Sequence, residues 1–161
     1  MILTAGGLAL VKHFEGLCLA AYFDRVRGGV LTIGYGHTHG VVEGMTITEP
    51  QAEGLLHLDI ASAAKTVRSV AGDATTDRQF SAMVSLAYNI GNSAFRSSTV
   101  LREHRATSHP VHAADAFLMW NKMHVDGVLV YVHGLDVRRR AERAMYMTPD
   151  TADFCLHDDN S

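Results

Sequence analysis

The chain has 161 residues, of which 47% are hydrophobic and 19% charged, and its formal net charge at pH 7 is −3. This length and mixed composition are typical of one globular domain, and the charge balance excludes a strongly basic nucleic-acid-binding protein. No apolar run approaches the roughly 20 residues that cross a membrane, so we expect no stable membrane insertion. Residues 1–149 should form the domain, and residues 150–161, with four of the seventeen acidic residues, an acidic tail.

The first predicted helix ends at Glu15. Its apolar residues recur at intervals that place them on one face, namely Leu8, Leu10, Val11 and Phe14. Gly16 follows directly, and glycine commonly ends a helix because it adopts the left-handed backbone conformation without strain. The pattern therefore predicts that Glu15 lies at a helix terminus.

A β-hairpin is predicted next, with strands over residues 22–24 and 30–35. The glycine pair at 28–29 supplies the flexible backbone that a tight turn needs. Asp24 is then expected at the turn end of the first strand.

The second strand of this hairpin should present an open face. Because side chains alternate along a strand, Thr32, Gly34 and Gly36 fall on the same face. The two glycines have no side chains, so a ligand is expected to approach beside the Thr32 hydroxyl.

Glu15 and Asp24 can together support the cleavage of a glycosidic bond. This reaction commonly needs one carboxylic acid that protonates the leaving oxygen and a second carboxylate that activates water or stabilises the cationic transition state. A glutamic acid among apolar neighbours suits the first role, and an ionised aspartate on a polar hairpin suits the second. Taken alone, either residue is more often a solvated charge or a helix cap, so the hypothesis depends on the pair.

The remainder of the chain is predicted to be mainly helical. Capping boxes at Thr48–Gln51 and Thr76–Gln79, a capping Ser98 and helical periodicity predict helices over residues 50–70, 76–90, 98–105, 111–120 and 135–147. A loop or small hairpin is predicted over 125–134. The helix over 76–90 should be the central core helix. The predicted fold is α+β and mainly α: a small β-hairpin lobe over about 13–47 is joined by a long helix to a larger helical lobe over about 73–147, which also includes the N-terminal helix.

Residues 14–38 read FEGLCLAAYFDRVRGGVLTIGYGHT. In the order EG, then AY and D, then TIGYGHT, they resemble the bacteriophage-type lysozymes of glycoside hydrolase family 24. Later segments follow the order of that family: SLAYNIG from residue 85, FRSSTVLR from 95, AADAFLMW from 113 and GLDVRRRAE from 134. The resemblance extends to about residue 146. It implies a lysozyme-like fold, with Glu15 as general acid, Asp24 as its carboxylate partner and Thr32 as the residue that positions the attacking water.

One departure from the family pattern concerns the turn of the hairpin. Seven residues separate Asp24 from Thr32, which is two more than the family most often has, so the turn at 25–29 should be two residues longer. An insertion of two residues preserves the alternation of a strand, whereas an insertion of one would reverse it. Thr32 is therefore expected to keep its face.

The resemblance also implies residues that contact the substrate, namely Tyr35, His37, Tyr88, Asn89 and Arg138. Two interpretations of Arg138 remain open: the matching arginine of the family pairs with the catalytic glutamate, and the alternative is a solvated arginine run with Glu142 as partner. His37 and His39 have the spacing of a metal pair, but no nearby cysteine or acidic cluster completes a site. We therefore expect no metal and no other cofactor.

The function implied by the resemblance is that of a lysozyme, which hydrolyses the β-1,4 bond between N-acetylmuramic acid and N-acetylglucosamine in peptidoglycan. Two alternatives remain open: a lytic transglycosylase, which uses one acid/base glutamate, and a noncatalytic muramidase-like module that binds the cell wall. The presence of Asp24 and Thr32 together with Glu15 argues against both alternatives.

The resemblance also bears on where the protein is made and on its partners. We expect a monomer that is made in the cytoplasm of the host bacterium and acts on peptidoglycan glycan strands after release. Release requires a holin or another membrane-disrupting partner in this family. Because disulfides are rare in the cytoplasm, Cys18 and Cys155 are expected to be free thiols.

Overall fold

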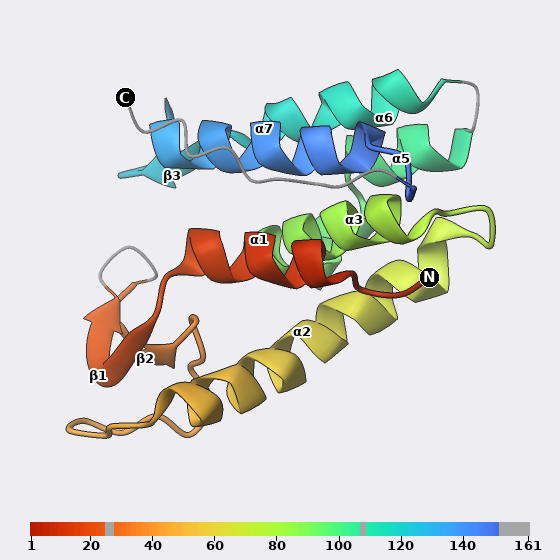
Figure 1. Cartoon of the computed structure of the whole chain (residues 1–161). Coiled ribbons are helices and arrows are strands. Elements are labelled where there is room, and N and C mark those ends of the chain that lie inside the picture. Colours follow the sequence, from red (N-terminus) through yellow and green to blue (C-terminus); the bar gives the residue numbers. More distant parts are fainter. Residues whose placement is uncertain (25–27, 107–108, 152–161) are drawn as a thin grey trace. The chain divides into compact units, whose positions relative to one another are not determined.

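The computed structural model describes residues 1–24, 28–106 and 109–151 of the chain (Figure 1). These residues are mostly helical, and their strands form two separate two-stranded antiparallel sheets. The predicted class, α+β and mainly α, is therefore confirmed.

The chain divides into two compact units. The hairpin unit is Val11–Ser62, and the helical unit consists of Met1–Leu10 and Ala63–Ser161. The division falls inside the first and second helices, so each of these helices contributes residues to both units. The lobe boundaries expected from the sequence, about 13–47 and 73–147, stay predictions.

The hairpin unit contains the end of the first helix and the first sheet. Its elements begin with α1 (Ala5–Glu15), β1 (Cys18–Asp24) and β2 (Val30–Gly34). Helix α1 ends at Glu15, as predicted. Gly16 has a φ of +69° and donates its N–H to the Lys12 carbonyl at 3.1 Å, which closes the last turn. The glycine thus fixes where Glu15 stands, just before β1.

Strand β1 is longer than predicted and has partners on both edges. One edge pairs with β2, with a bulge in the N-terminal half of β1. On the other edge, the Ala21 N–H donates to the Met45 carbonyl at 2.8 Å and the Ile47 N–H donates to the Leu19 carbonyl at 2.9 Å. A bulge interrupts the alternation of side chains, which explains why the sequence pattern indicated only the end of β1 nearest the turn.

The expectation that the second strand presents an open glycine face is wrong. Strand β2 ends at Gly34, which has a left-handed φ of +65°, and Ile33 and His37 then exchange two backbone hydrogen bonds of 2.9 Å. A Cβ at Gly34 would lie 3.4 Å from the Ala52 Cβ, so this position faces packed protein. Because the chain turns here, the period of two stops at Gly34, and Gly36 belongs to the turn.

Helix α2 (Glu49–Ala71) begins with the predicted capping box. The Thr48 N–H donates to Gln51 Oε1 at 2.8 Å, and the Gln51 N–H donates to Thr48 Oγ1 at 3.4 Å. In the hairpin unit, the buried side of α2 carries Ala52, Leu56 and Ile60. Their spacing of four residues places them on one face of the helix.

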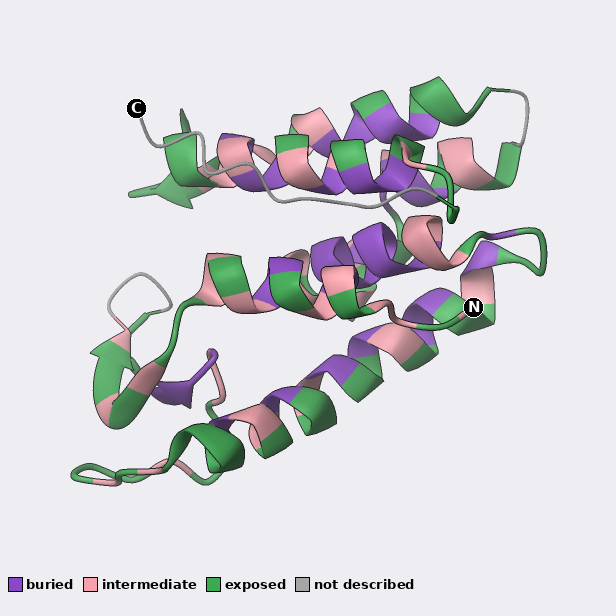
Figure 2. Ribbon diagram, viewed as in Figure 1, coloured by how far each residue is buried: buried purple, intermediate pink, exposed green. Residues whose placement is uncertain are grey.

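The helical unit is organised around α3 (Asp77–Ile90). The other elements are α4 (Asn92–Arg96), α5 (Thr99–Ala106), α6 (Pro110–Phe117), the 3-10 turn Leu118–Trp120, β3 (Lys122–Val125), β4 (Val128–Tyr131) and α7 (His133–Met147). Residues 80–87 of α3 are all buried (Figure 2), and within the helical unit the helix packs against α7. A helix that is buried on every side lies in the core, as predicted for this segment.

The first turn of α3 is capped by residues close to it in the sequence and by one residue far from it in the sequence. The capping box predicted there is present. In addition, the N–H groups of Asp77 and Arg78 donate to the carboxylate of Asp150 at 3.1 and 3.0 Å. The chain after α7 therefore returns to the first turn of α3. The rest of the predicted acidic tail, residues 152–161 with Cys155, lies outside the described residues.

Some short elements differ from the sequence prediction. Helix α4 was not expected, and the helix predicted over 111–120 is helical to Phe117 and then narrows to a 3-10 turn. The segment expected as a loop or small hairpin is the β3–β4 hairpin. Ser98 caps α5 as expected, since its hydroxyl accepts the Leu101 N–H at 3.2 Å. Short elements carry too few residues for a clear period, so their boundaries depend on packing.

Candidate active site

Asp24 and Thr32 lie on one face of the first hairpin. In the observed register Asp24 pairs with Val30, and Tyr22 pairs with Thr32. Directly paired residues have their side chains on the same face, and residues two positions apart share a face, so Asp24 and Thr32 are diagonal neighbours. The longer turn predicted between them includes residues 25–27, which lie outside the described residues.

The hydroxyl of Thr32 is held as a hydrogen-bond acceptor. Thr32 is fully buried, and its Oγ1 donates to the Val30 carbonyl of its own strand at 3.1 Å. Since a hydroxyl has one proton, this bond leaves the oxygen lone pairs to face other groups. The hydroxyl oxygen can therefore accept a hydrogen bond from a donor that reaches it.

Glu15 stands at the end of α1 and is half-buried. It belongs to the hairpin unit together with Asp24 and Thr32, so the three residues predicted to be catalytic are in one compact unit. Cys18, at the start of β1, is a free thiol whose Sγ donates to the Ala20 carbonyl at 3.2 Å.

Tyr35 and His37, which were predicted to contact the substrate, both belong to the hairpin unit. Tyr35 is only 5% exposed. His37 Nδ1 is hydrogen-bonded to Asp59 Oδ2 at 2.8 Å, and its Nε2 is hydrogen-bonded to the His39 carbonyl at 2.8 Å. Both ring nitrogens are therefore engaged, and the ring fastens the turn after β2 to α2. Asp59 lies 22 residues from His37, and no local sequence signal identified it as the partner.

Tyr88, Asn89 and Arg138 belong to the helical unit. Tyr88 and Asn89 are half-buried near the end of α3, and Asn89 Oδ1 accepts a hydrogen bond from Arg139 at 2.7 Å. Arg138 is buried and donates from Nε to Glu142 Oε1 at 3.1 Å. Glu142 is thus the partner expected in one interpretation, but the expected solvation is wrong because the pair lies in the core. Pairing of Arg138 with the catalytic glutamate stays a prediction.

Glu142 is the centre of a buried polar cluster between α3 and α7. Its carboxylate is fully buried, accepts the Ser85 hydroxyl at 2.7 Å and lies 3.1 Å from each of the Arg138 and Arg139 side chains. Arg138 also donates to the Ser85 carbonyl at 3.2 Å. One buried carboxylate therefore contacts two buried guanidinium groups, and its bond to Arg138 holds that side chain in place.

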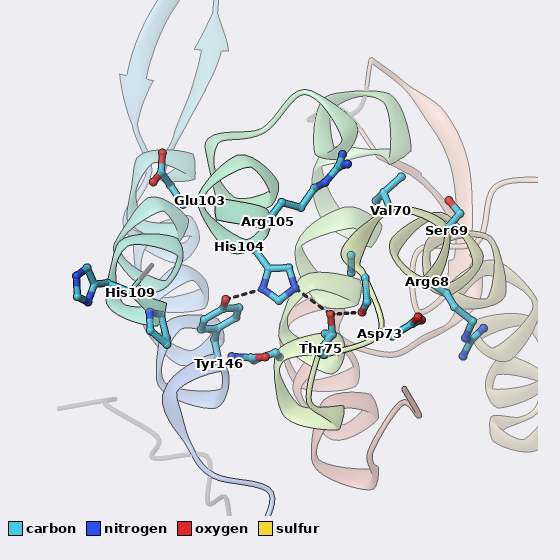
Figure 3. A pocket seen from close by; sticks show the side chains of 15 residues that line it. Arg68, Ser69, Val70, Asp73, Thr75, Glu103, His104, Arg105, His109 and Tyr146 are labelled. Atoms are coloured by element: carbon cyan, nitrogen blue, oxygen red, sulfur yellow. Dashed lines mark hydrogen bonds between the residues drawn. The ribbon is translucent and has the colours of Figure 1, made fainter. Parts of the chain in front are cut away.

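A separate pocket of about 710 Å³ opens in the helical unit around His104 (Figure 3). Gln79 and Tyr146 line it from the first turn of α3 and the last turn of α7. Asn89, at the other end of α3, is ten residues from Gln79, or about 15 Å along the helix axis. The pocket is therefore distinct from the predicted substrate contacts of this unit.

Three side chains that line this pocket, Thr75, His104 and Tyr146, are linked in series by hydrogen bonds. The Thr75 hydroxyl donates to the Gly72 carbonyl at 2.7 Å, so it must accept from His104 Nε2 at 2.9 Å. His104 Nδ1 then accepts the Tyr146 hydroxyl at 2.7 Å. Burial lowers the pKa of His104 and raises the pKa of Tyr146 to about 12. These groups bind each other, so the chain joins three segments of the unit and does not offer a ligand site.

This arrangement makes stability depend on pH through His104. Because the pKa of folded His104 is below its ordinary value of 6.5, the unfolded chain binds more protons just below that pH. The stabilisation is fully present above pH 6.5 and should fall as the pH drops through the lowered pKa. Urea unfolding between pH 7.5 and 5 is expected to show this loss in the wild type and a smaller loss in His104→Gln.

His109 provides the control for that measurement, because it lines the same pocket but is exposed. His109→Gln should keep the pH dependence of the wild type. Equal slopes for wild type and His104→Gln would contradict the role of the His104 chain.

No metal site or membrane span occurs within the parts of the chain that the structure describes. No group of three or more His, Cys, Asp and Glu side chains there is arranged to hold a metal ion. Among the same residues, no helix combines the length and the apolar character that crossing a membrane requires.

Known proteins similar to this chain are phage endolysins and lysozymes. An endolysin of Acyrthosiphon pisum secondary endosymbiont phage 1 is 38% identical over 146 residues, which cover 91% of this chain and 98% of the relative. The endolysin of Salmonella phage P22 is 37% identical over 153 residues, or 92% and 99% of the two chains. Among solved structures, an endolysin from Escherichia coli O157:H7 phage FAHEc1 aligns with a TM-score of 0.85 at 40% identity, covering 91% of this chain and 94% of that one.

Another solved structure with a TM-score of 0.85 is the muramidase domain of SpmX from Asticaccaulis excentricus. It is 33% identical and covers 92% of this chain and 99% of that domain. The family model described as phage lysozyme matches residues 12–142, which include the helix end, the first hairpin and the Arg138–Glu142 cluster. With relatives of this identity aligned over nearly the whole chain, the protein belongs to the phage lysozyme family.

Proposed function

We propose that this protein is an endolysin that hydrolyses the β-1,4 bond between N-acetylmuramic acid and N-acetylglucosamine in bacterial peptidoglycan. Its family is one of peptidoglycan-hydrolysing enzymes, and its relatives over nearly the whole chain are named endolysins. The observation that carries the proposal is the hairpin unit, which combines a glutamic acid at a helix end with an aspartate and a threonine on one face of the hairpin.

In the proposed reaction Glu15 is the general acid. Its carboxyl proton passes to the glycosidic oxygen as the bond from that oxygen to the muramic C1 breaks, and the N-acetylglucosamine side leaves as an alcohol. The position of Glu15 at the end of α1, in the same compact unit as Asp24 and Thr32, supports this role.

In this proposal Asp24 and Thr32 orient the water molecule that attacks C1. The water donates one hydrogen bond to the Asp24 carboxylate and one to Thr32 Oγ1, whose own proton is held by the Val30 carbonyl. A lone pair of the water oxygen is then free to form the new bond to C1, and the water gives up a proton on the Asp24 side. Attack from the face opposite the leaving group inverts the configuration at C1, as the family resemblance implies.

Tyr88 and Asn89 are half-buried and are proposed to contact the glycan strand. Arg138 is buried against Glu142, which favours a supporting role for this residue. For Tyr35 and His37, burial and the engaged ring nitrogens favour support of the site over direct hydrogen bonds to sugar. We propose that the protein is a monomer and that it is made in the host cytoplasm. It reaches the wall after a holin or another membrane-disrupting partner acts.

Analysis of reaction products tests this function. Purified peptidoglycan is digested with the protein, and the soluble fragments are analysed by mass spectrometry. Hydrolysis at the proposed bond gives fragments with reducing N-acetylmuramic ends. Anhydromuramic ends would instead indicate a lytic transglycosylase, and undigested glycan with bound protein would indicate a noncatalytic wall-binding module.

A further inference from the structure

Lys12 connects the three elements around the predicted catalytic residues. It lies in the last turn of α1, three residues before Glu15, and its Nζ forms an ion pair and hydrogen bond with Glu53 of α2. The same Nζ is 5.3 Å from the centroid of the Tyr35 ring. Tyr35 follows Thr32 by three residues, so Lys12 contacts the chain that continues from β2. All of these residues belong to the hairpin unit.

The backbone of Lys12 also shapes the end of α1. Its carbonyl accepts the N–H of Gly16, which has a left-handed φ of +69°. Lys12 therefore holds the turn that carries Glu15 in two ways, by a side-chain contact to α2 and by the hydrogen bond that ends the helix.

The ion pair persists over a wide pH range. The hydrogen bond to Glu53 raises the pKa of Lys12, and the hydrogen bond to Lys12 lowers the pKa of Glu53. The two side chains are 28% and 46% exposed, and ion pairs this exposed contribute little to the free energy of unfolding. The effect of this contact on the geometry of the site can therefore be measured without a large loss of stability.

We propose that Lys12 is a positioning residue of the reaction, which fixes the Glu15 carboxyl relative to the hairpin that carries Asp24 and Thr32. This inference rests on the proposed role of Glu15 as general acid. Proton transfer to a leaving oxygen depends strongly on distance, and a displacement of about 1 Å can reduce a rate by about 10²-fold. Loss of the Glu53 contact would let the last turn of α1 move against β2 and α2.

The test measures kcat and KM on purified peptidoglycan, with the thermal unfolding temperature as a second readout. Lys12→Met keeps the length of the side chain but removes the charge, and it should lower kcat about tenfold with KM little changed. Lys12→Arg keeps the ion pair and should retain most of the wild-type kcat. Glu53→Met removes both the charge and the hydrogen-bond acceptor of the same contact from α2, and it should reproduce the loss without altering α1.

A double variant, Lys12→Met with Glu53→Met, should have the kcat of Lys12→Met, because the first substitution already removes the contact with residue 53. Arg143→Met is the matched control, since it removes an exposed ion pair with Asp115 on other helices. It should leave kcat unchanged.

The outcomes separate this inference from the proposed function. A wild type that hydrolyses peptidoglycan while Lys12→Met and Glu53→Met match its kcat would overturn the positioning role alone. A loss of kcat that follows only the loss of unfolding temperature would do the same, because it would reflect stability. A wild type without hydrolytic products would overturn the proposed function, and the positioning role with it.

Discussion

Glu15→Gln is expected to lower the rate of peptidoglycan hydrolysis by about 10²–10⁴-fold, which is the usual contribution of a general acid. Glutamine has the size of glutamic acid but carries no acidic proton, so the leaving oxygen would depart as an unstable alkoxide. The loss should appear in kcat, because the amide preserves the shape that binds the glycan. Release of soluble fragments from purified peptidoglycan measures the rate.

Glu43→Gln is the matched control for this substitution. Glu43 is an exposed residue of the same hairpin unit and has no proposed role in the reaction. Its variant should hydrolyse peptidoglycan at the wild-type rate, and both variants should unfold at the wild-type temperature. A Glu15→Gln protein with near wild-type turnover would remove the assignment of Glu15 as general acid.

Glu142→Gln is expected to reduce the free energy of unfolding by about 3–5 kcal/mol, because it removes the buried carboxylate that contacts two buried guanidinium groups. Arg138 and Arg139 are both buried and cannot regain hydration without opening the contact between α3 and α7. For a chain of this size the unfolding temperature should fall by roughly 10 °C. Urea titration and thermal unfolding followed by circular dichroism measure both quantities.

Asp115→Asn makes the same change of acid to amide at an exposed ion pair with Arg143. Exposed pairs are worth about 0–1 kcal/mol, so this variant should be nearly as stable as the wild type. If Glu142→Gln cost no more than Asp115→Asn, the buried cluster would not be a major source of stability in the helical unit.

The local features of this fold were predictable from the sequence alone. The end of α1 at Glu15, the capping boxes of α2 and α3 and the Ser98 cap each depend on residues within about four positions of one another. Such signals involve residues within about one helical turn of each other. They therefore do not depend on tertiary packing. The same reasoning placed Asp24 and Thr32 on one hairpin, and the observed register puts them on one face.

Burial was less predictable than secondary structure. Leu58 lies in the apolar pattern of α2 and yet is 71% exposed, whereas Glu142 and its two arginines look like a solvated run and are buried. Hydrophobicity along one helix indicates which face is apolar on average. It does not indicate where a second helix will cover that face, and this decides which individual residues are buried.

The sequence by itself determined the family, the order of the longer helices and the first hairpin, and the candidates Glu15, Asp24 and Thr32, because each of these follows from motifs or short-range periodicity. The tertiary structure alone decided the partners of those elements. His37 binds Asp59 from 22 residues away, Lys12 binds Glu53 from 41, and the Ser85 hydroxyl reaches Glu142 across 57. Contacts over such separations depend on how whole helices pack, and no local pattern of side chains encodes that arrangement.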